Sequence, residues 1–457
     1  MEDTIAAIAT APGESGIGII RISGENSFDI INRIFKSKTK NKISQIDDRK
    51  LIYGHIYENG GIIDEVLVAY MKAPRTYTKE DVVEINCHGG IIAIRRILEL
   101  ILKNGVRLAE KGEFTKRAFL NGRIDLSQAE AVIDLISSKT DKGFDIALKQ
   151  LEGNLSFSIQ EIRDKLLQII AHITVNIEYP DEDIEEITYN DLLSQINDIL
   201  KRINYLIDSS ETGKIIKEGL RTVIIGKPNV GKSSLLNALL KESRAIVTEI
   251  PGTTRDIIEE MLNINGIPLI IIDTAGIRET SDQVEKIGVE KTKETFNKGD
   301  VIIFILNAAE ELTHEDFMIM ELLKNKKAII LFNKTDLPVK CDIEEVRKKL
   351  VNKKIIYTSI KEGQGLKELE KTISDMVYTG QIRQDNNLFI TNVRHKNLLE
   401  KSKNYIIDAV SMLKRKEALD FIEIDLRNAW ESLGEIIGES ITEDIIDEVF
   451  ARFCLGK

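Results

Sequence analysis

Eight consecutive residues, 226–233, combine the residue types that bind phosphate: Gly-Lys-Pro-Asn-Val-Gly-Lys-Ser. They match the P-loop pattern in full. They lie between a strand-like apolar run at 222–225 and a helix-like run at 234–240, which is the context that the pattern requires. The glycines let backbone N–H groups surround phosphates, Lys232 should neutralise the β- and γ-phosphates, and Ser233 should ligate Mg²⁺. The stretch therefore predicts a nucleoside triphosphate site.

Two further motifs select the base. Asn333-Lys334-Thr335-Asp336 follows an apolar run at 328–332, and Ser359-Ile360-Lys361 follows a strand-like run at 354–358. The Asp336 carboxylate can accept hydrogen bonds from guanine N1 and N2, a donor pair that adenine lacks. The second motif suits a loop that supports the base through its backbone. The nucleotide is therefore predicted to be GTP rather than ATP.

The machinery for hydrolysis is only partly visible. Asp273-Thr274-Ala275-Gly276 ends the apolar run 269–272, where Asp273 can hold Mg²⁺ through water and the Gly276 N–H can reach the γ-phosphate. Gly252-Thr253-Thr254-Arg255-Asp256 occupies the expected place of switch I, and spacing alone does not choose which threonine completes the Mg²⁺ shell.

The position at which Ras-like GTPases carry a water-orienting glutamine is Ile277, which cannot hydrogen-bond to water. Either hydrolysis is slow, or a nearby acid does this work. The candidates are Glu279, Asp282 and Glu285, each of which can equally be an ordinary surface acid. Two arginines, at positions 255 and 278, are candidate arginine fingers or surface ion-pair partners.

The secondary structure that must position these residues differs between segments of the chain, because the pattern of apolar and polar residues changes. Strand-like stretches separated by glycine and polar residues occupy 1–118, with a helical spacing at 91–102, which indicates an α+β domain. Residues 119–214 and 379–457 are helical, and dense apolar runs alternate with helical patterns over 215–378. The predicted fold class is thus multidomain. It comprises an N-terminal α+β domain and a discontinuous all-α domain, into which a Ras-like α/β P-loop G domain is inserted.

Composition limits the classes of partner and the cellular location that we expect for this protein. The net charge of −11 argues against nucleic-acid binding driven by overall charge, and three widely spaced cysteines are not a disulfide framework. No apolar run approaches the ~20 residues of a membrane helix, and the first residues are acidic rather than basic. A cytoplasmic protein without a membrane partner is expected.

One local region is basic. This basic region, 103–123, either contacts nucleic-acid phosphates or is simply a solvated face, and no RNA-binding module with interleaved aromatic residues is recognisable. Its basic residues are Lys103, Arg107, Lys111, Lys116, Arg117 and Arg123.

Sequences outside the G domain resemble the tRNA-modifying GTPases of the MnmE/TrmE family, and the resemblance extends over the whole chain. It rests on Thr-Ile-Ala-Ala-Ile-Ala-Thr at 4–10, Gly-Ile-Ile-Arg-Ile-Ser-Gly at 18–24, the segment 84–90, the segment 112–122, and Phe-Cys-Leu-Gly-Lys at 453–457.

The resemblance implies a GTP hydrolase, an enzyme acting on acid anhydrides. It implies a homodimer that joins the flavoprotein MnmG/GidA in a heterotetramer. The complex adds a carboxymethylaminomethyl or aminomethyl group to C5 of the wobble uridine of certain tRNAs. The one-carbon unit would come from a tetrahydrofolate derivative, 5,10-methylene- or 5-formyl-tetrahydrofolate, bound by the N-terminal domain 1–118. The helical parts would be 119–214 and 379–457, and the G domain 215–378.

The resemblance also implies site residues. Glu285 would position the attacking water as the catalytic residue. Ser233 and Thr254 would bind Mg²⁺. A K⁺ site would use Asn229, Thr248, Ile250 and Thr253, and the cation would replace an arginine finger. Folate would contact Arg21, Glu84, Arg123 and Lys457. Arg123 departs from the lysine expected there.

Motifs and resemblance together predict a set of GTP-binding residues. They are Asn229, Val230, Gly231, Lys232, Ser233, Ser234, Thr248, Glu249, Ile250, Pro251, Gly252, Thr253, Thr254, Asp273, Thr274, Ala275, Gly276, Asn333, Lys334, Asp336, Ser359, Ile360 and Lys361.

Three points stay open on sequence alone. Cys454 is either a small buried hydrophobe or a residue with a chemical role. His88 either lines the folate pocket or is a structural turn histidine.

The competing function is a regulatory GTPase in ribosome assembly, and a weaker third function is a folate enzyme in which GTP is only regulatory. An assembly GTPase usually carries an RNA-binding domain such as a KH fold, which the helical flank lacks.

Overall fold

The computed structural model describes residues 3–11, 13–38, 48–178, 189–242, 260–272, 298–378 and 388–457. The chain divides into two compact units. The first comprises Met1–Ile133, Gln150–His172 and Leu426–Lys457, and the second comprises Asp134–Lys149 and Ile173–Asp425. Among the described residues, no helix is both long enough and apolar enough to cross a membrane.

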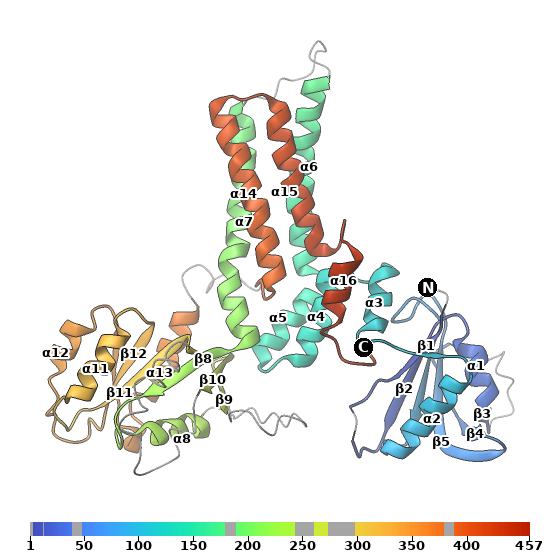
Figure 1. Ribbon diagram of the computed structural model, residues 1–457, viewed down its shortest axis with the longest axis horizontal. Helices are drawn as coiled ribbons and strands as arrows, with labels where there is room; N and C mark the ends of the chain where they lie inside the picture. The colour runs from blue at the N-terminus through green and yellow to red at the C-terminus, as the bar shows by residue number, and fades with distance from the viewer. Residues whose placement is uncertain are drawn as a thin grey trace. The chain divides into compact units, whose positions relative to one another are not determined.

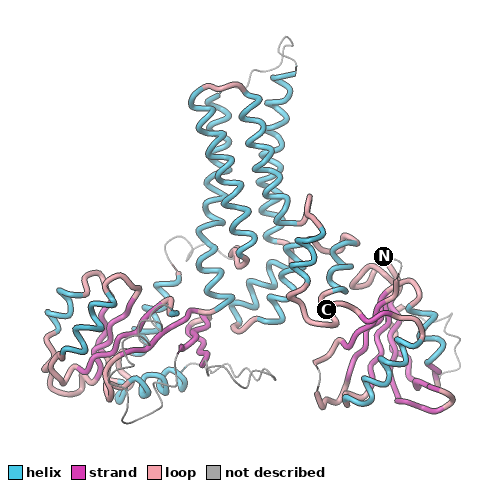
Figure 2. Tube along the Cα trace, viewed as in Figure 1, coloured by secondary structure: helices cyan, strands magenta, loops and turns pink. Residues whose placement is uncertain are grey.

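A mixed sheet dominates the first unit (Figures 1 and 2). Its described strands lie in the order β3-β4-β5-β6-β2-β1-β7. The strands are β1 (Ile5–Ile8), β2 (Gly18–Ser23), β3 (Phe35–Ser37), β4 (Leu51–Glu58), β5 (Gly61–Met71), β6 (Val82–Cys87) and β7 (Arg107–Leu108). Its helices include α1 (Ser27–Ile34), α2 (Ile91–Lys103), α3 (Glu113–Leu120) and α16 (Glu443–Phe450).

Side-chain alternation places the core on one face of this sheet. Val66 and Val68 of β5 pack with Ile31 of α1 and Ile97 of α2, and all four side chains are at most 2% exposed. The residues between them in β5 therefore point to the opposite face, where Leu67 is 40% exposed. Helices α1 and α2 cover the core face.

The second unit contains a sheet whose six described strands lie in the order β13-β12-β11-β8-β10-β9, with only β9 antiparallel to its neighbour. The strands are β8 (Leu220–Ile225), β9 (Glu260–Ile264), β10 (Ile267–Ile272), β11 (Val301–Asn307), β12 (Ala328–Asn333) and β13 (Lys354–Tyr357). The helices around it are α8 (Lys232–Glu242), α11 (His314–Leu323), α12 (Ile343–Lys349), η2 (Ile360–Glu362) and α13 (Leu366–Val377).

Both faces of this sheet are buried, as the dense apolar runs predicted. In β11, Ile303 and Ile305 belong to one apolar cluster with residues of α8 and α13, whereas Ile302 and Phe304 belong to another with residues of α11 and α12. Because parallel strands end at the same edge, the segments after β8, β12 and β13 meet there.

Six further helices lie among the described residues outside the two sheets. They are α4 (Leu126–Ser137), α5 (Asp141–Leu151), α6 (Asn154–Glu178), α7 (Tyr189–Glu218), α14 (Val393–Arg415) and α15 (Leu419–Ile437). Within the second unit α7 packs along α14 (Figure 1). Helices come before and after the α/β segment in sequence, which confirms the predicted fold class.

Candidate functional site

The P-loop connects β8 to α8, as predicted. Gly226 and Gly231 adopt φ values of 149° and 110°, which favour glycine. A Cβ on Gly231 would also lie 2.3 Å from Nδ2 of Asn333. The ammonium of Lys232 donates to the carbonyl oxygens of Gly226 (2.6 Å) and Lys227 (2.8 Å), so it is held inside the loop.

Burial lowers the pKa of Lys232 from its ordinary value. A desolvated ammonium gains most from an anion placed beside it, because the anion compensates the loss of hydration. The first turn of α8 adds the positive end of a helix dipole at the same place. These features suit a polyphosphate.

Asn333 ties three segments of the site together. Its Nδ2 donates to the Val230 carbonyl at 2.8 Å, and its Oδ1 accepts from the Ile360 N–H at 3.2 Å. Asn333 is only 3% exposed. The P-loop, the end of β12 and the segment after β13 are therefore brought together, as the strand-end motifs predicted.

The residue expected to bind the base is also oriented. The Ser359 hydroxyl donates to Oδ1 of Asp336 at 2.8 Å, and the Thr335 N–H donates to the Thr358 carbonyl at 3.2 Å. Lys334, between Asn333 and Thr335, adopts a left-handed backbone conformation with φ 64°. One carboxylate oxygen is thus fixed from the β13 side, which leaves the other available to a ligand.

One contact of the P-loop was missed by sequence reasoning. The Lys227 ammonium pairs at 2.7 Å with Asp316, whose side chain is 1% exposed at the start of α11. Asp316 also accepts from the N–H and hydroxyl of Thr313, both at 2.9 Å. The Thr-x-x-Asp spacing of a capping box was the signal in the sequence that marked this helix start.

Several predicted residues lie outside the described ranges. They are Thr248, Glu249, Ile250, Pro251, Gly252, Thr253, Thr254, Asp273, Thr274, Ala275, Gly276 and Glu285, together with the alternatives Glu279, Asp282, Arg255 and Arg278. Their roles stay predictions.

A second group of predicted residues converges in the first unit. Arg21 and Glu84 are cross-strand neighbours on β2 and β6, and their side chains form an ion pair at 2.8 Å. The Arg21 guanidinium lies 5.6 Å from the ring centroid of Tyr77, and that of Arg123 lies 4.7 Å from the same ring. Arg123 Nη1 also donates to the Tyr77 carbonyl at 3.2 Å. Two of the four predicted folate residues, Arg21 and Arg123, thus lie against Tyr77, which sequence reasoning did not single out, and a third, Glu84, is paired with Arg21.

Comparison with known proteins shows the family of the chain. The family described as "MnmE helical domain" matches residues 126–454, and "GTP-binding protein TrmE N-terminus" matches residues 4–123. Proteins named "tRNA modification GTPase MnmE" are similar over full length. Those of Alkaliphilus metalliredigens and Alkaliphilus oremlandii are 59% and 56% identical over 459 residues, and that of Clostridioides difficile is 56% identical over 457 residues. Each alignment covers 100% of both chains.

The chain belongs to the MnmE family of tRNA modification GTPases.

The predicted family is therefore confirmed, and so is the predicted enzyme class.

The fourth predicted folate residue, Lys457, is the last residue of the C-terminal tail 453–457. This tail contacts the N-terminal sheet of the MnmE-family chain. Leu455 forms a bridge with Lys111, and a Cβ on Gly456 would lie 2.2 Å from the Ile8 carbonyl oxygen. Ile8 is adjacent in β1 to Ala7, the register partner of Arg21. The tail therefore approaches the same part of the sheet as the Arg21 side chain. Cys454 within it is exposed, so its interpretation as a buried hydrophobe is wrong.

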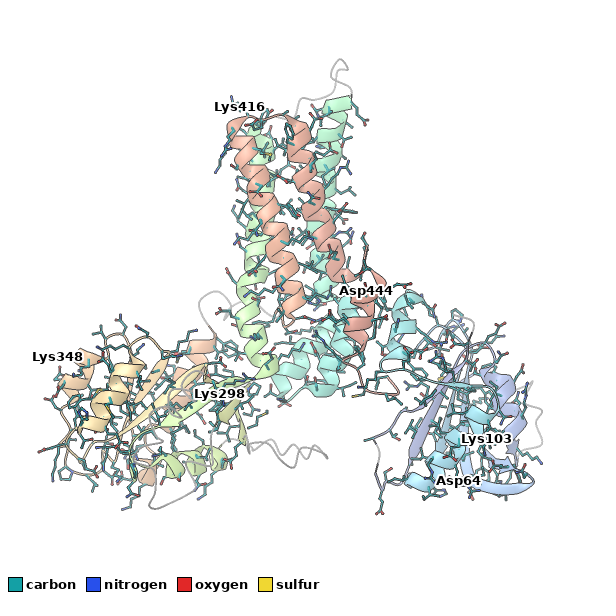
Figure 3. The ribbon with its side chains drawn as sticks, viewed as in Figure 1. Asp64, Lys103, Lys298, Lys348, Lys416 and Asp444 are labelled. Atoms are coloured by element: carbon teal, nitrogen blue, oxygen red, sulfur yellow. The ribbon has the colours of Figure 1, made fainter. Side chains whose placement is uncertain are left out.

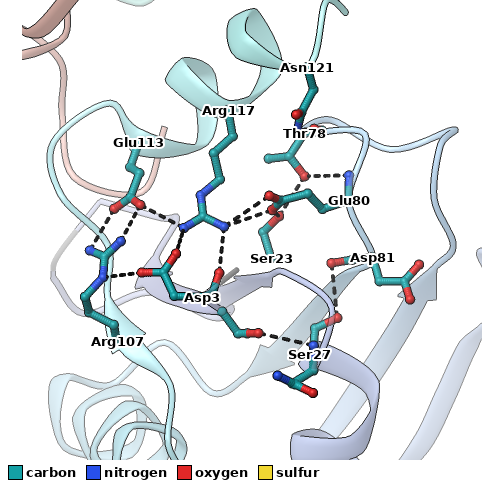
Figure 4. A network of polar contacts seen from close by, with 12 residues as sticks. Asp3, Ser23, Ser27, Thr78, Glu80, Asp81, Arg107, Glu113, Arg117 and Asn121 are labelled. Carbon is teal, nitrogen blue, oxygen red and sulfur yellow. Dashed lines mark hydrogen bonds and ion pairs between the residues drawn. The ribbon is translucent and has the colours of Figure 1, made fainter. Parts of the chain in front are cut away.

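The predicted basic region 103–123 is largely neutralised within the chain (Figure 4). Arg117 is 1% exposed and forms ion pairs with Glu113 (2.9 Å), Asp3 (2.7 Å) and Glu80 (3.1 Å). Arg107 also pairs with Glu113, at 2.5 Å. Lys103 and Lys116 pair with Glu58 and Asp447, respectively. These pairs argue against a continuous phosphate-binding patch, and because Arg117 is buried the region is not simply a solvated face either.

Burial and ion pairing have opposite effects on the pKa values of the acids in this network. Burial alone would raise the pKa of Glu113, but the hydrogen bonds from Arg107, the Glu110 N–H and Arg117 outweigh it, so the pKa lies below its ordinary value. The pKa of Asp3 is lowered as well, chiefly by its hydrogen bond from Arg107.

His88 resembles a structural turn residue more than a pocket residue. Its Nδ1 lies 2.6 Å from Oδ1 of Asp64, and its backbone N–H donates to the other carboxylate oxygen of Asp64 (labelled in Figure 3). The hydrogen bond to Asp64 raises the pKa of His88. The pair stabilises the turn between β6 and α2.

Proposed function

We propose that this chain hydrolyses GTP in the complex that adds a carboxymethylaminomethyl or aminomethyl group to C5 of the wobble uridine of certain tRNAs. The observation that carries the proposal is full-length similarity to MnmE proteins combined with a guanine-nucleotide site whose described parts converge. The chain would act as a homodimer together with the flavoprotein MnmG, in the cytoplasm, with the domain division 1–118, 119–214, 215–378 and 379–457.

GTP would be held at three points. Lys232 contacts the β- and γ-phosphates, Ser233 and Thr254 bind Mg²⁺, and Asp336 binds the guanine. The described residues fit this role, because Lys232 lies in a desolvated loop at a helix N-terminus and Asp336 is oriented by Ser359. Mg²⁺ would neutralise charge that develops on the phosphates. Glu285 would position the attacking water.

A potassium ion would take the place of an arginine finger. The proposed ligands are Asn229 with Thr248, Ile250 and Thr253, an oxygen-donor set that suits a hard cation. Asn229 adopts φ 62° at the tip of the P-loop, next to the phosphate-binding backbone. GTP hydrolysis should therefore be faster in KCl than in equimolar NaCl. Equal rates in the two salts would contradict this part of the proposal.

A tetrahydrofolate derivative would bind at Arg21, Glu84, Arg123 and Lys457. Guanidinium and ammonium groups suit the carboxylates of the folate tail, and the Tyr77 ring offers an aromatic surface between two of the cations. The planar guanidinium of Arg123 can hold a carboxylate in place of the expected lysine. The bound folate would supply the one-carbon unit of the modification.

The decisive experiment measures modified nucleosides in bulk tRNA by liquid chromatography and mass spectrometry. Deletion of the gene should abolish the aminomethyl-type wobble uridines, and the intact gene should restore them. An unchanged profile in a strain without a second copy would overturn the tRNA role. A ribosome-assembly GTPase would then be the better explanation.

A further inference from the structure

The P-loop lies against other segments of the G domain at both of its ends. At its start, a Cβ on Gly226 would lie 2.4 Å from the Ile305 carbonyl oxygen, so the backbone lies directly against β11. Near its end, the Val230 carbonyl accepts from Nδ2 of Asn333 at 2.8 Å. The tip between these two contacts, residues 228–229, is exposed. The conformation of this tip therefore depends on the residues directly beside it.

Lys227, directly before the tip, connects the loop to a helix. Its ammonium lies 2.7 Å from Oδ2 of Asp316 in α11, and the two side chains are 13% and 1% exposed. The same oxygen accepts from the N–H and the hydroxyl of Thr313, both at 2.9 Å. Helix α11 is packed into the core, where Met320 and Leu323 are at most 1% exposed. Asp316 is therefore a firmly held partner for the loop.

The negative charge of Asp316 is not required by its helix. A neutral asparagine could accept the same two hydrogen bonds from Thr313, so the capping box alone does not need a carboxylate. The other oxygen of Asp316, Oδ1, is buried and accepts no hydrogen bond from the described residues. A buried charge is costly unless an opposite charge lies beside it. Lys227 supplies that charge, so the carboxylate is explained by its pairing with the P-loop.

Lys227 is also the residue against which the phosphate-binding lysine rests. Its side chain meets Asp316, whereas its backbone carbonyl oxygen accepts from the Lys232 ammonium at 2.8 Å. Lys232 is the residue proposed to contact the β- and γ-phosphates. Two contacts thus connect the start of α11 with the ammonium of Lys232, and both of them involve Lys227.

We propose that Asp316 is a positioning residue for guanine-nucleotide binding, and that it acts through Lys227 by holding the P-loop in its phosphate-binding conformation. A loop that is ordered before the ligand arrives loses less conformational entropy on binding, so the nucleotide is held more tightly and leaves more slowly. The inference rests on the nucleotide site of the proposed function and is independent of the tRNA, folate and potassium parts of that function.

Positioning can be separated from a direct effect of the two charges on the phosphates. If the charges acted only through space, loss of the Lys227 cation would weaken binding, whereas loss of the Asp316 anion would strengthen it. If Asp316 acts through Lys227, either change breaks the same contact. Both changes then weaken binding, and their effects are not additive. The sign of the Asp316 effect therefore distinguishes the two explanations.

The test measures the release of GDP labelled with a methylanthraniloyl fluorophore from the full-length protein, by stopped flow after addition of excess unlabelled GDP. Asp316→Asn and Lys227→Gln should each speed release roughly 3- to 100-fold, the range of coupling between residues in contact. The double variant should match the faster single variant within about 2-fold. Lys227→Arg should retain slow release, because a guanidinium can pair with the same carboxylate.

A matched control pair lies on the same helix. Lys324 and Glu321 of α11 form an ion pair at 2.6 Å, and their side chains are 48% and 65% exposed. Lys324→Gln combined with Glu321→Gln removes the same two charges and should leave the rate of GDP release unchanged. Urea unfolding shows which variants are folded. If Lys227→Gln does not fold, Asp316→Asn still decides by the sign of its effect, because it leaves no buried carboxylate unpaired.

Three outcomes would overturn the proposal. One is GDP release at the wild-type rate from folded Asp316→Asn, and another is slower release from this variant, which would indicate action through space. The third is full additivity of the two single effects in the double variant, which would mean that the residues act separately. All three leave the proposed nucleotide site standing. A wild-type chain that binds no GDP would overturn that site together with the inference.

Discussion

Replacement of Asp336 by asparagine should convert the nucleotide preference from guanine to xanthine. The Ser359 hydroxyl donates to Oδ1 of Asp336 at 2.8 Å, and an asparagine can retain this bond through its own Oδ1. Its Nδ2 then occupies the place of the second carboxylate oxygen. The amide there donates a hydrogen bond instead of accepting one.

The cost for GTP follows from the donors of guanine. A hydrogen bond to a charged group contributes about 1.5–3 kcal/mol, and an amide N–H facing a base N–H leaves both donors unsatisfied. A loss of about 2–4 kcal/mol is expected, which weakens GTP binding roughly 30- to 1,000-fold. Xanthine carries a carbonyl where guanine carries its amino group, so XTP can accept from Nδ2 and should bind the variant more tightly than GTP.

Equilibrium titration with fluorescent GTP and XTP analogues measures both affinities. Asp342→Asn is the matched control, because it removes the same charge from the same domain. Asp342 caps α12 by accepting from the Glu345 N–H at 3.0 Å, and asparagine caps helices equally well. An Asp336→Asn variant with wild-type GTP affinity, or one with no gain for XTP, would refute the assignment of Asp336 to the base.

Three further predictions concern hydrolysis, stability and pH. Glu285→Ala should spare GTP binding and slow single-turnover hydrolysis about 100-fold or more, since a water-positioning group would be lost. Gly213→Ala should lower the free energy of unfolding by about 1–3 kcal/mol, because its Cβ would lie 2.3 Å from the Ile390 carbonyl oxygen. Glu113→Gln should destabilise the chain near neutral pH and by less in acid. The folded-state pKa of this acid is lowered, so its contribution is present above its ordinary pKa and is lost as pH falls below it.

Each of these has its own check. An unchanged single-turnover rate would remove Glu285 from the mechanism. Gly143→Ala is the helical control for Gly213, since its Cβ would meet nothing nearer than 3.4 Å, and urea unfolding followed by circular dichroism should show no loss of stability. For Glu113, a stability difference between wild type and variant that stays constant from about pH 7 to about pH 3 would contradict the pKa argument.

The parts of the site that could be predicted are those fixed by local pattern. Asn333 ends a buried parallel strand, and such strands end at one edge, so its approach to the P-loop follows from sequence order and periodicity. The basic region 103–123 shows the opposite case. The partner of Lys116 is Asp447, 331 residues away, and the buried Arg117 forms an ion pair with Asp3. Pairing over such separations depends on the tertiary fold, which local spacing does not encode.

The same limit applies to the insertion of the G domain. Helical texture on both sides of 215–378 predicts the insertion, but the contacts through which the chain returns to the helices after it depend on single residues. The Thr212 hydroxyl donates to the Val377 carbonyl at 2.9 Å, and Ser209 Oγ accepts from the Ile390 N–H at 3.1 Å. Gly213 follows Thr212 in α7, and the absence of a Cβ there lets the backbone of Ile390 approach the helix. The segments around Val377 and Ile390 therefore both contact α7 within two turns of each other. The host helices tolerate an insertion of this length because the ends of the inserted segment are held close together, and a loop with adjacent ends adds little entropic cost as it lengthens.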